Sequence, residues 1–168
     1  MKNIIPLIII VLFISCSKND DNSNIETGTG TTIDQIIGEW QPLKQVDFYD
    51  NGNIDSYDYT NCQRQSRSIF ESDGNFDFFN YNPDSNGNCV ITIVNPVFQS
   101  GTWEKVAEGK YKITSIYFDN DTQQTETQTY ITDEISFLNG NIMRWRVDVG
   151  EVNNGVTFLY YYTEFIKI

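Results

Sequence analysis

Tight-turn sequences recur at short, nearly regular intervals from residue 39 to the C-terminus of this chain. Asn-Gly or Asp-Gly steps at 51–52, 73–74, 139–140 and 154–155 supply residues that accept a positive φ, as hairpin turns require. Each step separates runs rich in β-branched and aromatic residues, and no run is long enough for a crossover helix. The pattern predicts a series of β-hairpins, of which the clearest spans 66–81.

The composition agrees with an all-β fold. Aromatic residues (11 Phe, 10 Tyr and 3 Trp) make up 14% of the 168 residues, which suits a sheet with a buried aromatic face. The turn spacing predicts about eight to ten antiparallel strands, and Pro42 in the first of them requires an edge or a bulge. Such strands lose their free edges either in an up-and-down barrel or in a sandwich of two sheets.

The N-terminus carries a different pattern. An apolar run over 4–14 is too short to span a bilayer as a helix and is typical of a signal peptide. It ends at Ser15-Cys16, which resembles the cleavage motif of bacterial lipoproteins. The resemblance implies that residues 1–15 are removed and that Cys16 carries acyl chains, which would anchor the protein stably in a membrane. An ordinary secretory peptide with a free Cys16 is the alternative.

A polar segment rich in Asn, Ser, Gly and Thr follows over 16–31 and is expected to be a flexible acidic tether. Its start, Ser-Lys-Asn-Asp-Asp at 17–21, resembles the export signals that send some lipoproteins to the outer face of the outer membrane. A solvated linker is the alternative. We therefore expect one β-domain over 32–168, held by its lipid anchor at the outer membrane and exposed at the cell surface if the export signal operates.

Charge and histidine content restrict the function. The formal net charge is −12, and such a surface repels phosphate backbones, so nucleic-acid binding is disfavoured. The sequence contains no histidine, which excludes Ser-His-Asp and Cys-His catalysis and the usual histidine-based zinc sites. We predict no enzymatic activity, no metal and no other cofactor.

Two cysteines remain besides the one at the lipoprotein motif. Cys62 and Cys89 flank the 66–81 hairpin in a chain that is exported to an oxidising compartment, so a disulfide between them is expected. A free reactive thiol is the alternative, but the chain offers no histidine to activate it.

The sequence Gly38-Glu39-Trp40 opens the first expected strand, and a similar phrase returns as Gly101-Thr102-Trp103-Glu104. Before it, Thr-Ile-Asp-Gln at 32–35 fits a helix-capping box. Together with the cysteine pair and the segment 70–76, these motifs resemble the lipocalin-like domains of bacterial lipoproteins.

This resemblance implies a lipocalin-like up-and-down barrel that is preceded by a short helical turn. It also implies a barrel-closing motif, in which Gly38 starts the strand and Trp40 packs across the closed end. In the family an arginine from a late strand often covers this tryptophan, and Arg144 or Arg146 is expected to do so here.

Three aromatic residues are candidates for lining a ligand cavity. Strand alternation places Met143, Trp145 and Val147 on one face and the two neighbouring arginines on the other. The arginine face is expected to face solvent; the alternative is a wet cavity wall where an arginine pairs with a carboxylate ligand. Tyr160 and Tyr162 share one face of the last strand, where their hydroxyl groups would orient a ligand. Core packing is the alternative for all three.

These observations favour a lipid-anchored envelope binding protein whose barrel interior holds a small, partly apolar ligand. The alternative is an interaction or structural accessory lipoprotein whose barrel is filled by its own side chains and which engages another envelope protein. An open cavity of about 300 Å³ or more would favour the first hypothesis. A filled interior with a large exposed apolar patch would favour the second.

Overall fold

The computed structural model describes residues 33–168, which form strands and turns with one short 3-10 helix. In chain order the elements are β1 (Gly38–Tyr49), β2 (Ile54–Asp58), η1 (Gln63–Gln65), β3 (Arg67–Phe70), β4 (Asn75–Phe79), β5 (Tyr81–Pro83), β6 (Cys89–Ile91), β7 (Val97–Ala107), β8 (Lys110–Asp119), β9 (Gln124–Ile131), β10 (Glu134–Leu138), β11 (Ile142–Asn153) and β12 (Val156–Lys167). No helix among these residues is long and apolar enough to cross a membrane. The expected all-β class is confirmed, whereas the predictions for 1–15, Cys16 and 16–31 lie outside the described residues.

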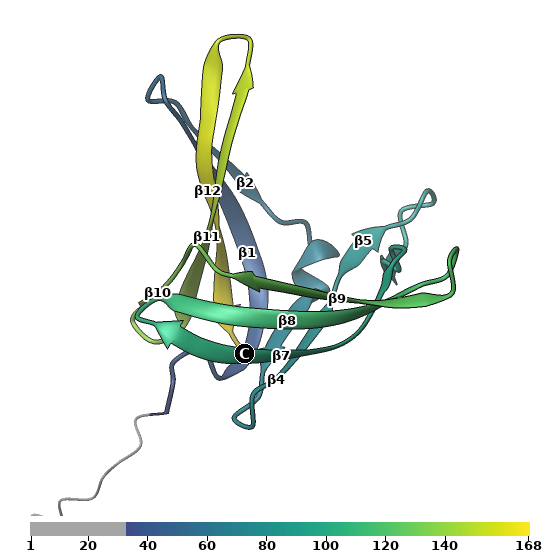
Figure 1. Ribbon diagram of the computed structural model, residues 1–168. Helices are drawn as coiled ribbons and strands as arrows, with labels where there is room; N and C mark the ends of the chain where they lie inside the picture. Colours follow the sequence, from purple (N-terminus) through teal and green to yellow (C-terminus); the bar gives the residue numbers. More distant parts are fainter. Residues whose placement is uncertain (1–32) are drawn as a thin grey trace, which may run out of the picture. The chain divides into compact units, whose positions relative to one another are not determined.

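Ten of the twelve strands form one antiparallel sheet (Figure 1). Its order is β10-β11-β12-β1-β3-β4-β7-β8-β9, with β2 added beside β1, while β5 and β6 form a separate two-stranded ribbon. Since β1 pairs with β12, the first strand meets the last, as in an up-and-down barrel. The two ends of this order are the edge strands β9 and β10, which follow one another in the chain.

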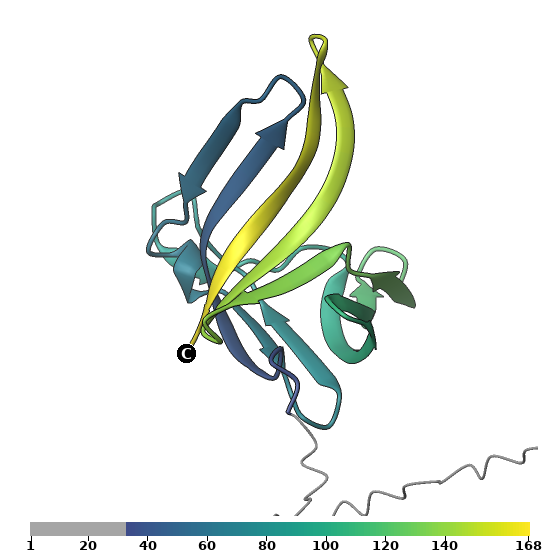
Figure 2. The same ribbon diagram turned by 90° about the vertical axis from the view of Figure 1, so that its left-hand side faces the viewer.

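These two edges approach each other near the β7–β8 turn. The Ile135 amide of β10 donates a hydrogen bond to the Gly109 carbonyl (2.7 Å), and the Thr132 amide donates to the Tyr111 carbonyl of β8 (2.9 Å). Farther along, β9 follows β8, while β11 and β12 run in a clearly different direction (Figures 1 and 2). The sheet is thus a curled half-barrel, consistent with the lipocalin-like fold.

Local shifts in strand pairing allow this curvature. The register of β1 against β12 shifts between Pro42 and Lys44, where Leu43 has no partner on β12, so the bulge that the sequence predicted for Pro42 lies directly after it. A second shift lies between Phe48 and Tyr49. A bulge bends its strand and increases its twist. The first residues of β1 therefore lie in the core, whereas its last residues pair with β2 and with the part of β12 that extends beyond the core (Figure 1).

The core lies at the closed end of the half-barrel. Trp40, Phe70, Tyr111, Ile113 and Met143 are buried there, and they come from strands distant in sequence. Their large apolar side chains supply most of the driving force for the closure of β1 onto its neighbours.

The segment before β1 forms a turn, not the short helix that the capping box at 32–35 suggested. Asp34 Oδ1 accepts hydrogen bonds from the Ile36 amide (3.1 Å) and from the Tyr111 hydroxyl (2.7 Å), and its Oδ2 pairs with Lys105 Nζ (3.4 Å). A helix has no room to continue because Gly38, with φ +141°, already begins β1. Asp34 therefore fixes this segment to β7 and β8.

Cys62 and Cys89 form the predicted disulfide, with an Sγ–Sγ distance of 2.07 Å. Cys62 directly precedes η1, and Cys89 is the first residue of β6. The bond therefore ties the β5–β6 ribbon to η1.

Candidate functional site

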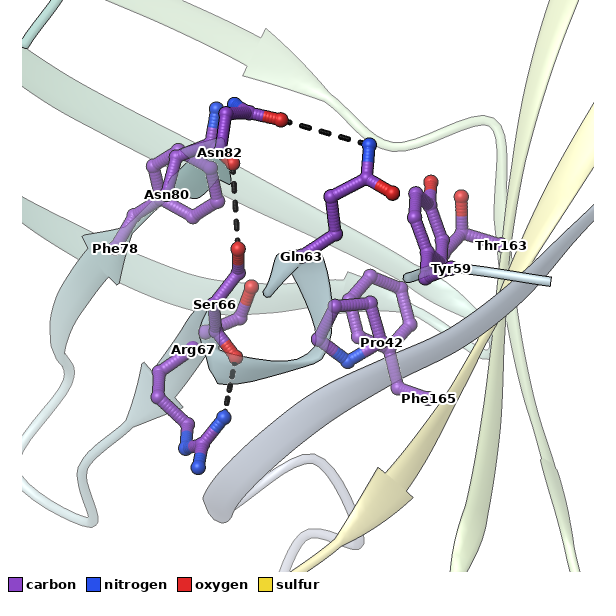
Figure 3. Close-up of a pocket in the computed structure, with 11 residues that line it drawn as sticks. Pro42, Tyr59, Gln63, Ser66, Arg67, Phe78, Asn80, Asn82, Thr163 and Phe165 are labelled. Carbon is purple, nitrogen blue, oxygen red and sulfur yellow. Dashed lines mark hydrogen bonds between the residues drawn. The ribbon is translucent and has the colours of Figure 1, made fainter. Parts of the chain in front are cut away.

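A cavity of about 300 Å³ opens beside η1 (Figure 3). We call it the polar compartment, because amide and hydroxyl side chains form much of its wall. It is lined by Pro42, Tyr59, Gln63, Ser66, Arg67, Ser68, Phe78, Asn80, Asn82, Thr163 and Phe165.

The amides of this wall are held in place and keep spare capacity for a ligand. Gln63 Oε1 accepts from the Thr60 amide (3.0 Å), and Gln63 Nε2 donates to Asn82 Oδ1 (3.5 Å). Ser66 Oγ donates to Asn80 Oδ1 (3.3 Å). A primary amide offers two donors and two acceptor lone pairs, so these bonds leave several sites for hydroxyl or amide groups.

Arg67 brings a charge to the lining, but its guanidinium is engaged elsewhere. Its Nε donates to Glu39 Oε1 (2.8 Å), and its Nη1 donates to the carbonyls of Arg64 (2.8 Å) and Ser66 (2.7 Å). The ion pair with Glu39 neutralises the charge, so the compartment suits an uncharged polar group better than an anion.

A second cavity of about 210 Å³ adjoins the first. It is lined by Ser68, Phe76, Phe78, Phe98, Ser115, Tyr117, Tyr130, Trp145 and Phe165, and we call it the aromatic compartment. Three of these residues, Ser68, Phe78 and Phe165, also line the polar compartment. Desolvation raises the pKa of Tyr130 to about 12, so its phenol stays neutral beside the stacked indole of Trp145.

The closed end of the sheet is built around Trp40. Its indole Nε1 donates to the Ile36 carbonyl (2.7 Å), and Lys167 Nζ lies 5.2 Å from the ring centroid. Gly38 makes this approach possible, because a Cβ atom there would overlap Cε of Lys167. A cation over an indole face adds an electrostatic attraction to the packing.

A family model described as "Lipocalin-like domain" matches residues 36–145, which include the Gly-x-Trp motif and both bonded cysteines. The chain belongs to the lipocalin-like domain family. No curated protein matches it in sequence. Lipocalin-like domains are binding-type folds and are generally not enzymes.

In this lipocalin-like domain the predicted arginine cover of Trp40 is wrong. Trp40 pairs with Lys167 across β1 and β12, so these two side chains share the inner face. Arg144 and Arg146 alternate with the cavity-lining Trp145 along β11 and therefore lie on the outer face.

The cavity-lining prediction is correct for Trp145, which lines the aromatic compartment, and wrong for Tyr160 and Tyr162. The cavity-lining residues of β12 are Thr163 and Phe165, and strand alternation places the two tyrosines opposite them. On that outer face the ring of Tyr160 stacks on Phe48, with centroids 4.5 Å apart.

The arginines of the outer face lie over these tyrosine rings. The guanidinium of Arg144 is 4.6 Å from the ring centroid of Tyr162, and that of Arg146 is 3.9 Å from Tyr160. The tyrosines therefore serve the packing of β11 against β12, with cation–π contacts on the solvent side.

Sequence reasoning missed Phe78 and the amides of Gln63 and Asn80. The alternation Phe76, Asp77, Phe78 in β4 could have indicated that Phe78 faces inward with Phe76. The amides carried no comparable signal, because the disulfide and the pairing of β5 with β6 bring them together in space.

Proposed function

We propose that this lipocalin-like domain is the binding part of a lipid-anchored envelope protein, and that its cavity holds one small amphipathic molecule. The observation that carries this proposal is the shared wall of the two compartments at Ser68, Phe78 and Phe165. One ligand could place an uncharged polar end beside Gln63 and a ring or alkyl end beside Trp145. Volumes of about 300 and 210 Å³ suit a small ligand of this kind.

Phe78 offers a direct test with the neutral fluorescent probe N-phenyl-1-naphthylamine. We expect the full-length protein to bind the probe with enhanced fluorescence, and Phe78→Ala to weaken binding about tenfold through lost aromatic contact area. Phe79→Ala is the matched control, because Phe79 is equally exposed (43%) yet lines neither compartment. Equal losses in the two variants, or no probe binding by the parent protein, would contradict the proposal.

The identity of the natural ligand requires extraction. The full chain, purified from its native membrane, should release a small molecule that mass spectrometry detects in the parent and finds depleted in Phe78→Ala. A molecule retained equally by both variants would not be the ligand of this cavity.

The membrane anchor is supported by the sequence, in which an apolar run ends at Ser15-Cys16. We expect Cys16→Ala to release the protein from the membrane fraction, whereas Ser17→Ala should leave it bound. Tight association of Cys16→Ala with membranes would contradict the acyl anchor.

A second candidate function is the engagement of another envelope protein. Its support is a group of exposed apolar residues after the disulfide, Ile91 (49%), Ile93 (74%) and Val94 (61%), beside a further cavity of about 280 Å³. Such exposure is typical of an interaction surface. The variant Ile93→Ser should abolish co-isolation of an envelope protein without changing probe binding, and retained co-isolation would exclude this surface.

A further inference from the structure

The inner face of the sheet continues from the polar compartment onto the projecting part of β1, β2 and β12. Thr163 lines the polar compartment, and Tyr161, two residues earlier on β12, lies on the same face. Asp47 of β1 is directly opposite Tyr161, and Asp55 of β2 is directly opposite Asp47. Residues directly opposite in a sheet point to the same side, so both carboxylates lie on this inner face.

These two carboxylates have no cationic partner among residues 33–168. Asp47 is only 7% exposed, and its Oδ1 accepts a hydrogen bond from Gln45 Nε2 (2.8 Å), but neither Asp47 nor Asp55 takes part in an ion pair. Buried carboxylates are normally paired with a cation, and like charges directly opposite in a sheet repel each other. Asp47 is therefore a buried carboxylate without a cationic partner in this part of the chain, and Asp55 adds a second negative charge beside it at an exposed position.

Several aromatic residues share this face with the two carboxylates. The rings of Tyr49 and Phe158 stack with centroids 5.2 Å apart, and Phe158 stacks on Tyr161 at 6.1 Å. Tyr57, which is 53% exposed, lies on the same face because it is opposite Gln45, and Gln45 is opposite Thr163.

The tyrosines remain neutral in this setting. Desolvation, followed by the negative charge of Asp47 and Asp55, raises the pKa of Tyr49, and desolvation with the charge of Asp55 raises that of Tyr57. Neutral phenol rings present their electron-rich faces without adding further charge.

We propose that this inner face binds a small organic ammonium ion, with Asp47 and Asp55 supplying the counter-charge and Tyr57, Tyr161 and their neighbours supplying ring faces. Carboxylates beside electron-rich rings are the chemistry that favours alkylammonium groups. No group of three or more His, Cys, Asp or Glu side chains that could hold a metal occurs within residues 33–168, and two carboxylates among rings suit a soft organic cation better than a metal ion. This site is separate from the proposed cavity ligand.

Choline and its uncharged isostere 3,3-dimethylbutan-1-ol test the proposal, because they differ mainly in one positive charge. In an NMR titration of the full-length protein, choline should shift the amide signals of Asp47, Tyr57 and Tyr161 and bind about tenfold more tightly than the isostere. Equal affinity for the two compounds, or choline-induced shifts confined to other residues, would overturn the proposal.

Two variants and one control test whether choline binding depends on these residues. Asp47→Asn keeps the shape of the side chain, removes its charge and should weaken choline binding about tenfold. Tyr57→Leu, at an exposed position that tolerates substitution, should weaken it about threefold. Asp58→Asn is the control, because Asp58 lies on the same strand but on the opposite face, next to Lys44; it should leave the affinity unchanged. Unchanged affinity in Asp47→Asn, or an equal loss in Asp58→Asn, would contradict the site.

Discussion

Gly38 shows how a single residue fixes the closed end of the sheet. Its φ of +141° is rarely accessible to other residues, and a Cβ atom there would overlap Cε of Lys167 above the ring of Trp40. Gly38→Ala should therefore lower the free energy of unfolding by about 2 kcal/mol, as measured by urea denaturation.

The double variant separates the two causes. Lys167→Ala removes the overlap but not the backbone strain, so the loss in Gly38→Ala/Lys167→Ala should be smaller than the sum of the two single losses. A strictly additive result would show that Lys167 does not restrict residue 38.

Glu164, on the outer face of the sheet, makes the stability of the fold depend on pH. It is 8% exposed, and it pairs with Arg144 (Nη2–Oε1 2.7 Å) and Lys44 (Nζ–Oε2 3.2 Å). Burial raises the pKa of Glu164, but the hydrogen bonds and charges of Arg144 and Lys44 outweigh it and lower the pKa below 4.5. The stabilisation is therefore present above pH 4.5 and is lost as the pH falls through the lower, folded-state pKa.

Thermal unfolding at several pH values checks this linkage. The melting temperature of the parent protein should fall below pH 4.5, and that of Glu164→Gln should fall less steeply. Glu126→Gln, at an exposed position of β9, should behave as the parent does. A parallel pH dependence in Glu164→Gln and the parent would contradict a role for Glu164.

The like charges of Asp47 and Asp55 make a further prediction about stability. Because the two residues are directly opposite across β1 and β2, Asp47→Asn should raise the free energy of unfolding by about 0.5 kcal/mol at low salt, and the gain should shrink as salt is added. Urea denaturation at two salt concentrations measures the difference. A loss of stability in Asp47→Asn would show that the carboxylate stabilises the sheet.

The structural role of a single residue could be predicted from the sequence where its chemistry allows few arrangements. Pro42 required an edge or a bulge, and Cys62 and Cys89 had each other as bonding partners among the described residues. The cation over Trp40 could not be predicted, because Lys167 reaches the ring through the register of β1 against β12, and the sequence does not contain that register.

Among the elements, η1 is held in position by a covalent bond, the disulfide of the directly preceding Cys62. The disulfide joins residues 27 positions apart, next to the helix that carries Gln63. On the chain-entropy estimate, Cys62→Ser/Cys89→Ser should lose about 3.5 kcal/mol of unfolding free energy. It should also bind N-phenyl-1-naphthylamine more weakly, since the wall of the polar compartment is no longer fixed.

Denaturation and probe titration of the double variant measure both effects. Cys16→Ser is the control, because it removes a cysteine outside the loop, and it should change neither quantity. Unchanged probe binding in the unbridged but folded protein would show that β5, β6 and η1 hold the wall without the bond.

Most strand positions followed from the turns, but the region from 89 to 107 did not. From the sequence alone, Asn95-Pro96 predicts a break in a strand over 89–98, and Gly101 predicts the start of a separate strand. In the structure β7 runs without interruption over Val97–Ala107. Gly101 does not end a strand; it allows β7 to approach Phe76 closely, since a Cβ atom there would lie 2.8 Å from a ring carbon of Phe76. A glycine that permits packing and one that makes a turn are identical in sequence.

At the scale of the described domain, the succession of hairpins explains why the pairing of the strands could be predicted and why the opening of the sheet could not. Tight turns require consecutive strands to pair, and the aromatic content of β1 and β12 favours their meeting, so an antiparallel curled sheet follows from the sequence. The opening between β9 and β10 does not follow, because these strands are consecutive and joined by only two residues, Thr132 and Asp133. Their separation results from the different directions that β8 and β11 take after leaving the core.

The two free edges of the sheet should differ from its centre in local stability. All eight residues of β9 are exposed, whereas β1 has partners on both sides. In native-state hydrogen exchange of dilute full-length protein, amides of β9 that are not bonded to β8 should exchange fastest, and those of β1 and β12 near Trp40 slowest. The comparison should be repeated at a tenfold higher protein concentration. If β9 is protected as strongly as β1 in dilute solution, the edge is covered within the monomer and the half-barrel is closed; if protection appears only at the higher concentration, a second copy pairs with β9.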